Sequence, residues 1–198
     1  VLDPVSLIFD KVRDAGCSFF SGYSFVYRDP RVPPGNTGIL TLCSITMDGV
    51  FQHHGIPVKV AYGGTLQIEK KNPIRFMNII GYQGSTIDPL QLFIGAGLTA
   101  ITRYCDTNSG LLLANVRQIP AGAEERSRSL ISEMQDCGFR FPLTMGKGRI
   151  FNLLTDPHRI SLVSFSGMNS IGSVFEAGYK FHTEIGAGTI PFSKVGDR

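Results

Sequence analysis

The chain has 198 residues, of which 42% are hydrophobic and 18% charged, with a formal net charge of +3. This composition excludes intrinsic disorder, which needs low hydrophobicity and high net charge, and the length suits one domain or two small ones. No apolar run reaches the roughly 18 residues of a membrane span, and no dense group of Lys and Arg indicates a sequence-independent DNA-binding surface.

The first half of the chain predicts a helix, short strands and a hairpin. A helix is expected over residues 3–15, because Asp3 and Pro4 favour a helix start and Gly16 favours its end. Strands are expected over residues 22–27, 39–46 and 56–62, with a loop over 29–38 and a short helix over 49–54. Alternating hydrophobicity over residues 65–82, interrupted by Lys-Lys-Asn-Pro, predicts a β-hairpin.

The second half begins with the clearest helix signal in the sequence. Asp88-Pro89 predicts a helix start with a capping box to Gln91. Apolar positions spaced by three or four residues continue it through Leu90, Ile94, Leu98 and Ile101. Two glycines inside it, Gly95 and Gly97, indicate close packing against another backbone. A strand over residues 111–119, a helix over 120–137, and a final strand, short helix and strand are expected after it.

The end of the chain resembles its middle. Gly49, Gly55 and Gly63 recur at a constant separation as Gly172, Gly178 and Gly186. We therefore predict a mixed α/β (α+β) fold with a mixed sheet, longer packing helices, and two strand–helix–strand units over about residues 39–68 and 160–192. A pseudo-twofold axis would relate the two units, and ligand sites often lie at such seams. Residues 1–30 are expected to form a helix–strand extension to a single domain over residues 31–198.

Several glycine-rich turns could present backbone N–H groups to an anion. They are residues 63–65, residues 186–189 and Gly84-Ser85-Thr86. For each of them a tight turn with no ligand is the alternative, and Asp88 would compete with an anion at the helix that follows Thr86. Asn169, within Gly167-Met168-Asn169-Ser170, also fits a helix cap.

Nothing in the sequence calls for a metal or for catalysis. Cys17, Cys43, Cys105 and Cys137 are widely spaced, so we expect four reduced, mostly buried thiols in a reducing, cytoplasmic compartment. The adjacent His53 and His54 would point apart on a helix and cannot share an ion. Because no nucleophile elbow, H-E-x-x-H or P-loop motif is present, we expect no enzyme, no metal and no cofactor.

From residue 38 to 192 the chain resembles the regulatory domain of NrpR, the archaeal repressor of nitrogen-assimilation genes. The resemblance rests on ordered segments that begin at Ile45 (ITMDGV), Gly55 (GIPV), Tyr62 (YGG), Arg75 (RF), Ile79 (IIGYQGSTIDPL), Ile119 (IPA) and Gly167 (GMN). The chain departs from the family pattern at Ser170, where a proline is expected, and over residues 145–156.

The resemblance implies a homodimer whose DNA binding is relieved by 2-oxoglutarate. DNA would be read by a winged helix-turn-helix domain absent from this chain, and a start at Val1 in place of Met suggests a piece of a longer protein. Arginine can bind carboxylates bidentately, and hydroxyls, amides and glycine-rich turns can add donors. The candidate ligand residues are therefore Thr65, Arg75, Ser85, Thr86, Arg117 and Asn169.

Two other functions remain open. The domain could be a ligand-free interaction module that contacts a transcription factor or co-repressor. Less favoured is an unrecognised enzyme acting on a carboxylate substrate, since the sequence names no general base.

Overall fold

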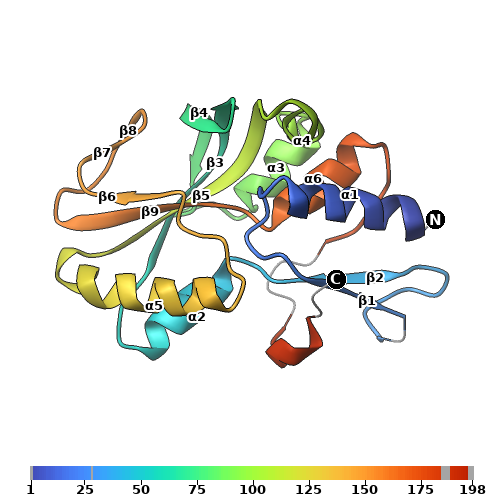
Figure 1. Ribbon diagram of the computed structural model, residues 1–198, viewed down its shortest axis with the longest axis horizontal. Coiled ribbons are helices and arrows are strands. Elements are labelled where there is room, and N and C mark those ends of the chain that lie inside the picture. Colours follow the sequence, from blue (N-terminus) through green and yellow to red (C-terminus); the bar gives the residue numbers. More distant parts are fainter. Residues whose placement is uncertain (1, 28, 184–187, 196–198) are drawn as a thin grey trace.

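Within residues 2–27, 29–183 and 188–195, which the computed structural model describes, the central element is a five-stranded sheet (Figure 1). Each pair of neighbouring strands in it is antiparallel. In spatial order the strands are β4 (Asn72–Gly81), β3 (Lys59–Glu69), β5 (Gly110–Pro120), β9 (Arg159–Phe165) and β6 (Thr144–Gly146). Helices accompany this sheet, so the α+β fold class is confirmed.

The central strand β5 is covered on both of its faces. Ile119 packs in a cluster with α2 (Ile45–His53) and α5 (Glu124–Asp136), which lie together at one end of the molecule (Figure 1). Leu112, Ala114 and Val116 point to the opposite face, because side chains alternate along a strand. They pack with residues of α1 (Leu2–Asp14) and α4 (Ile101–Thr107). Burial on both faces accounts for the apolar residues of β5, which are interrupted by Asn115, Arg117 and Gln118.

Two small hairpins and two 3-10 helices lie outside the five-stranded sheet. The strands β1 (Tyr23–Val26) and β2 (Gly38–Thr41) form one hairpin, and β7 (Arg149–Ile150) and β8 (Leu153–Leu154) form the other. The 3-10 helices are η1 (Ala121–Ala123) and η2 (Phe192–Lys194). None of the described helices has the length and apolar character needed to cross a membrane.

The N-terminal segment is packed into the rest of the fold. Val12 and Cys17 belong to the hydrophobic cluster that includes residues of α4. Phe19 and Phe20 belong to the hydrophobic cluster that includes residues of α2 and α5. Because β1 also pairs with β2, the predicted extension and the predicted domain share hydrophobic clusters and a sheet.

The long helix predicted from Asp88 to Ile101 is wrong, because the chain folds there as two short helices. The first is α3 (Pro89–Gly95), and α4 starts only at Ile101. Gly97 has a φ of +66°, which a helix does not accommodate, and Leu98 is 40% exposed. A side chain at Gly95 or Gly97 would meet open space, so close packing does not explain these glycines.

The predicted strand boundaries near the first Gly-Gly pair are also wrong. β3 runs without a break through Gly63 and Gly64, and its turn into β4 lies at Lys70 and Lys71, both with positive φ. A Cβ at Gly64 would lie 2.5 Å from the Asn78 carbonyl oxygen. The Gly-Gly pair therefore permits close strand packing inside the sheet. The strand expected over residues 39–46 ends at Thr41, and α2 begins four residues later.

The internal repeat holds for its helices and not for its final strand. α2 and α6 (Met168–Glu176) are nine residues each and are followed by Gly55 and Gly178, both with positive φ. β3 follows α2, whereas residues 188–195 contain no strand after α6. The sheet position beside β9 is already occupied by β6, which leaves no edge there for a returning strand. Gly186 lies outside the described residues.

Candidate functional site

A buried ion pair lies at the centre of the sheet. Arg117, on β5, donates from Nε to Asp48 Oδ1 at 2.5 Å and from Nη2 to Asp48 Oδ2 at 3.1 Å. Its side chain is 3% exposed and that of Asp48, on α2, is 8% exposed. A two-point contact of this kind fixes the planar guanidinium and links α2 to the sheet through opposite charges.

Three neutral residues extend the ion pair into a polar network. Arg117 Nη2 also donates to Ser44 Oγ at 2.9 Å, and Asn115 Nδ2 donates to the same oxygen at 3.3 Å. The Tyr82 hydroxyl donates to Asn115 Oδ1 at 3.0 Å. Burial, and next the charge of Asp88, raise the pKa of Tyr82 well above its ordinary value, although Arg117 opposes the shift. Tyr82 therefore remains a neutral donor.

The start of α2 is held by this network through Ser44. Ser44 occupies the N-cap position, yet its side chain makes no cap hydrogen bond and instead accepts from Arg117 and Asn115. The first turn of the helix therefore lacks the side-chain acceptor that an N-cap serine usually supplies. Asp48 lies in this first turn, where the helix N-terminus favours its negative charge.

Two buried polar atoms of this region have no hydrogen-bond partner among the described residues. They are Arg117 Nη1 and Ser164 Oγ. Ser164 pairs with Asn115 in the register of β9 and β5, so its side chain shares the face of Asn115 and Arg117. Buried polar groups in proteins are nearly always hydrogen-bonded, so these two atoms are candidate partners for an acceptor ligand.

The structure brings one of the six predicted ligand residues, Arg117, into this network. Thr65 is buried on β3, where its Oγ1 accepts from Asn78 Nδ2 at 2.9 Å. Arg75 is exposed on β4 and donates from Nε to Gln67 Oε1 at 3.2 Å. Ser85 and Thr86 are exposed in the loop after Tyr82, where Ser85 Oγ donates to the Ile87 carbonyl oxygen at 2.5 Å.

The sixth residue, Asn169, is buried in α6 and its amide is fully engaged. Its Oδ1 accepts from the Leu113 N–H at 2.8 Å, and its Nδ2 donates to the Cys17 and Leu113 carbonyl oxygens at 2.8 and 3.1 Å. Asn169 thereby continues the hydrogen bonding of β5 where β9 has ended. These bonds leave its amide no donor for a ligand.

The predicted anion turns have other structural roles. Residues 63–65 lie within the β3 ladder, so their N–H groups face neighbouring strands. At α3, Asp88 Oδ1 accepts from the N–H groups of Leu90 and Gln91 at 2.7 and 3.3 Å. The Gln91 side chain does not close a capping box, because it donates to Thr183 Oγ1 at 2.7 Å. The turn over residues 186–189 lies partly outside the described residues.

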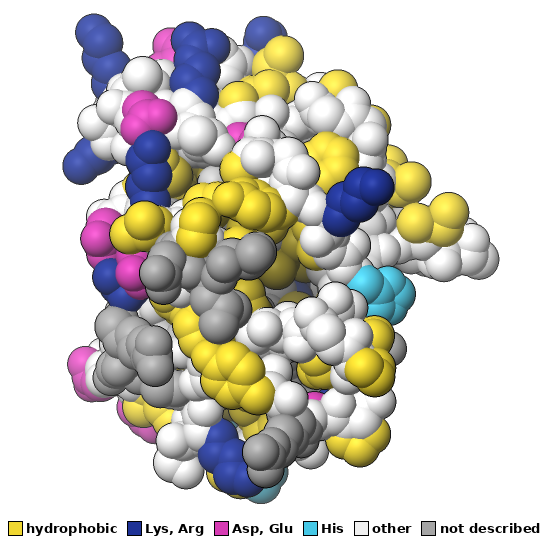
Figure 2. Space-filling model, turned by 90° about the vertical axis from the view of Figure 1, so that its right-hand side faces the viewer, with side chains coloured by type: hydrophobic (Ala, Val, Ile, Leu, Met, Phe, Trp, Pro, Cys, Tyr) yellow, Lys and Arg dark blue, Asp and Glu magenta, His cyan; other side chains and the backbone are white. Residues whose placement is uncertain are grey.

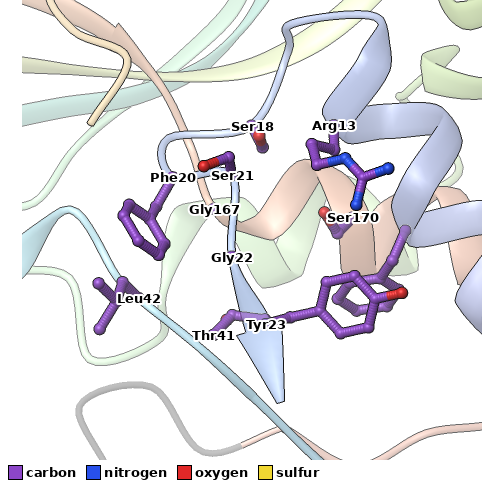
Figure 3. A pocket seen from close by; sticks show the side chains of 11 residues that line it. Arg13, Ser18, Phe20, Ser21, Gly22, Tyr23, Thr41, Leu42, Gly167 and Ser170 are labelled. Atoms are coloured by element: carbon purple, nitrogen blue, oxygen red, sulfur yellow. The ribbon is translucent and has the colours of Figure 1, made fainter. Parts of the chain in front are cut away.

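A small cavity at the start of α6 is a second polar site. Figure 3 shows Ser18, Ser21 and Ser170 around it, with Arg13 at one side. The cavity measures about 10 Å³, room for about one water molecule, and a dicarboxylate does not fit. Arg13 is ion-paired with Asp10 at 2.8 Å, so its charge is compensated. A water here would satisfy the buried Ser18 hydroxyl, which has no partner among the described residues.

Sequence reasoning missed most of the network. Its overlooked members are Ser44, Asp48, Tyr82, Asn115 and Ser164. One signal was available, because Asp48 is the one charged residue in the mainly apolar stretch from Ile45 to Phe51, and a buried carboxylate needs a cation. Among the described residues, no group of three or more His, Cys, Asp or Glu side chains could hold a metal ion.

Comparisons with known proteins point to one family. The family model "NrpR regulatory domains NRD1 and 2" matches residues 1–197. The chain is 34% identical to the global nitrogen regulator NrpRI of Methanosarcina mazei over 77% of its own length and 48% of the relative's. It is 30% identical to the global nitrogen regulator NrpR of Methanococcus maripaludis over 82% of its own length and 30% of the relative's. The chain thus spans half the length of these relatives or less.

A solved structure supports the same fold. The chain superposes on a nitrogen repressor-like protein from Methanococcus jannaschii with a TM-score of 0.73, covering 91% of this chain and 76% of the other. Sequence identity between the two is 22%, so this likeness concerns the fold alone.

Proposed function

The chain belongs to the family of NrpR regulatory domains, and from that premise we propose that it senses 2-oxoglutarate and dimerises within an archaeal repressor of nitrogen regulation. The curated relatives that it matches are global nitrogen regulators, and the chain corresponds to half of their length or less. The observation that carries the proposal is the buried Arg117 guanidinium, which has one unpartnered nitrogen among the described residues.

The chemistry of 2-oxoglutarate suits the Arg117 network. The ligand has two carboxylates and a keto oxygen, all acceptors, and the network contributes donors from the Arg117 guanidinium and from the second N–H of the Asn115 amide. Because Arg117 is already neutralised by Asp48, a ligand carboxylate competes with the Asp48 carboxylate for the guanidinium. The unpartnered Nη1 is a further donor that the ligand carboxylate would engage when it takes the place of Asp48.

Displacement of Asp48 offers a route from effector to signal. Asp48 is the charged link between α2 and β5, so its release changes how α2 is held on the sheet. Relay requires that the effector bind one arrangement of the domain more tightly than the other. In the longer repressor, that change would alter the dimer and, through it, the DNA-binding domain.

The test is a thermal-shift titration with 2-oxoglutarate, with glutamate and succinate as control ligands. The chain contains no Trp, so calorimetry or a dye must report unfolding. Ligand at about 100 times its Kd adds about 2.7 kcal/mol of stability, equivalent to several degrees in Tm. We expect a saturable shift with the keto acid alone, and no shift at millimolar 2-oxoglutarate would contradict effector sensing.

Two arginine variants locate the binding site. Arg117→Gln should abolish the shift, whereas Arg75→Gln, which changes an exposed arginine on β4, should retain it. The reverse result would place the effector at Arg75. Light scattering with and without ligand measures the proposed dimer, and DNA binding is tested in a longer protein that contains this domain and a DNA-binding domain.

One observation favours a second candidate, an interaction domain that needs no effector. Figure 2 shows a band of hydrophobic side chains down the middle of one face, with Lys and Arg mainly toward its rim. Large exposed apolar side chains of the chain include Leu7, Tyr27, Phe175, Phe181 and Phe192. Exposed apolar surface of this kind often marks a protein contact. Binding of a purified transcription factor by a chain that gives no shift with 2-oxoglutarate would favour this candidate.

A further inference from the structure

A side chain from the β7–β8 hairpin binds the outer edge of the strand β4. The Phe76 N–H donates to Asn152 Oδ1 at 2.8 Å, and Asn152 Nδ2 donates to the Phe76 carbonyl oxygen at 3.0 Å. β4 is the outermost strand on this side of the five-stranded sheet, and its one neighbour among the described strands is β3. The Asn152 amide thus makes the two hydrogen bonds that a residue of a further strand would make.

These two bonds show which backbone groups of β4 face outward. Phe76 lies opposite Leu66, and its N–H and C=O point away from β3 because Asn152 engages both. In an antiparallel pair every second residue pair has this orientation, so Ile79, opposite Gly64, faces the same edge. Asn152 therefore covers one of the two outward-facing residues in the middle of the strand.

The hairpin fixes Asn152 at this edge through apolar contacts. Ile150 is buried in the same hydrophobic cluster as Phe76. Phe151 and Leu153 pack against that cluster, and the rings of Phe151 and Phe76 lie 6.2 Å apart, edge to face. Phe151 has a φ of +53°, which an aromatic residue rarely adopts, and such a conformation persists where its surroundings determine it.

The hairpin also connects the two edges of the sheet. β6, the edge strand on the other side, ends at Gly146, and β7 begins three residues later (Figure 1). Thr155 closes the base of the hairpin, since its N–H and its hydroxyl donate to the Gly148 carbonyl oxygen at 2.6 and 2.5 Å. Asn152 lies within residues 145–156, where the sequence departs from the family pattern, so the resemblance did not predict this contact.

β4 is a strand on which another chain could pair. Arg75 is its only charged residue, and its large exposed apolar side chains, between 36% and 46% exposed, are Ile74, Met77 and Ile79. Register shifts beside Ile74 and Met77, together with Pro73, disturb the first part of the strand, as bulges and prolines do on protected edges. Asn152 binds where these features leave the backbone of the middle of the strand available.

We propose that Asn152 is an edge guard, which occupies within one chain a pairing site that fits β4 of a second copy. The partner is a second copy because two antiparallel edges related by a two-fold axis supply each other's donors and acceptors. With the axis between the outward-facing Phe76 and Ile79, the two Arg75 side chains do not lie opposite each other. The inference depends neither on effector binding nor on the Arg117 network.

The test compares the association state of Asn152→Ala with that of the unaltered chain, by sedimentation velocity over a range of concentrations. The unaltered chain gives the baseline, whether it is monomeric or dimeric through another face. We expect assemblies of the variant with about twice the baseline mass or more, because the Phe76 backbone groups become available for pairing. At low concentration, hydrogen exchange of the Phe76 amide should be about tenfold faster in the variant.

The matched control is Asn78→Ala, which removes a part-buried hydrogen bond from an asparagine of the same strand to Thr65 on β3. This change leaves the outer edge covered, so it should not alter the association state. Association caused by lower stability alone would appear in both variants. Equal association of the two variants, or no association of Asn152→Ala, would overturn the proposal.

Two further variants identify the surface. In Asn152→Ala/Ile79→Lys, a lysine on the edge strand should return the association state to the baseline. In Asn152→Ala/Met77→Cys, oxidation should link two copies at position 77, and Met77→Cys alone should give little of this product. Association that persists with the lysine, or no linkage at position 77 in peptide mapping, would mean that the copies do not pair through β4.

Discussion

The helices α2 and α6 are alike in length and in how they end, but they are attached to the sheet by different chemistry. Each is nine residues long and is followed by a glycine with positive φ. At the start of α2, Ser44 and Asp48 engage Arg117 of β5, so an ion pair makes the connection. At the start of α6, Asn169 makes it through neutral hydrogen bonds to Leu113 and to the Cys17 carbonyl oxygen.

A ligand can replace the connection at α2, but it cannot replace the connection at α6. A carboxylate ligand can compete with the Asp48 carboxylate, because both are anions that bind a guanidinium. It has no equivalent place at Asn169, whose partners are backbone groups of both polarities. Under the proposed function, α2 is therefore the helix that an anion would release from the sheet, and α6 is the helix that would stay attached.

The largest expected effect comes from removing the cation of the α2 connection. Arg117→Met leaves the Asp48 carboxylate buried without its partner, and we expect a loss of about 3–5 kcal/mol in the free energy of unfolding, measured with urea. The double variant Arg117→Met/Asp48→Leu should recover much of that loss, because it removes both charges.

The matched control is Arg128→Met, which breaks an exposed pair with Glu124. That change should cost less than about 1 kcal/mol. A double variant no more stable than Arg117→Met would mean that the unpaired Asp48 is not the source of the loss.

The neutral connection of α6 should be nearly as costly to break. Asn169→Ala leaves the Leu113 N–H and two carbonyl groups without this partner in a buried site, and we expect a loss of about 2–4 kcal/mol. Asn78→Ala, which removes a part-buried hydrogen bond to Thr65, is the control and should cost about 1 kcal/mol. Similar losses for Asn169→Ala and Asn78→Ala would mean that Asn169 contributes no more to stability than a part-buried hydrogen bond. The difference in free energy of unfolding between Asn169→Ala and the unaltered chain should be the same with and without 2-oxoglutarate, whereas the difference for Arg117→Met should change when the ligand is added.

The α2 network also predicts a loss of stability at alkaline pH. Burial raises the pKa of Tyr82, so the folded state keeps this phenol protonated where the unfolded chain ionises, above about pH 10. Its contribution is therefore fully present below pH 10 and is lost as pH rises, by at most about 1.4 kcal/mol for each pH unit. Unfolding of Tyr82→Phe between pH 9 and 11 should show a shallower slope. An unchanged slope in Tyr82→Phe would mean that the burial of Tyr82 is not the source of the loss.

The sequence predicted best where a local signal and the tertiary structure agree. The strand β5 and the helix α5 follow apolar patterns, and Gly138 ends the latter with a positive φ, as expected. The prediction over residues 88–101 was wrong because helical spacing of apolar residues continued through Gly97, whose backbone leaves the helix.

The residues of the candidate site could not be predicted from local sequence patterns, because contacts between distant parts of the chain bring them together. Arg117 and Asp48 are separated by 69 residues, and only the packing of α2 on β5 makes them a pair. Arg117 was predicted from its chemistry, whereas Ser44 and Asn115 were missed because their role follows from that packing. By sequence, Asn169 was a candidate ligand residue but was favoured as a helix cap, and neither pattern could predict its hydrogen bonds to β5.

The smallest expected effect comes from replacing glycine with alanine at the equivalent position of α2 and α6. Gly49 in α2 and Gly172 in α6 are equivalent in the repeat, and alanine favours a helix over glycine by about 1 kcal/mol. A Cβ at Gly49 meets nothing within 4 Å, so Gly49→Ala should raise the free energy of unfolding by about 0.5–1 kcal/mol. A Cβ at Gly172 would lie 2.5 Å from Cδ1 of the fully buried Ile101, and that overlap outweighs the helix preference. Gly172→Ala should therefore destabilise by about 1 kcal/mol, and urea unfolding of both variants measures the two signs. Stabilisation by both substitutions would mean that α6 is held as loosely at this position as α2, and the contrast between the two helices would then lie only in their first turns.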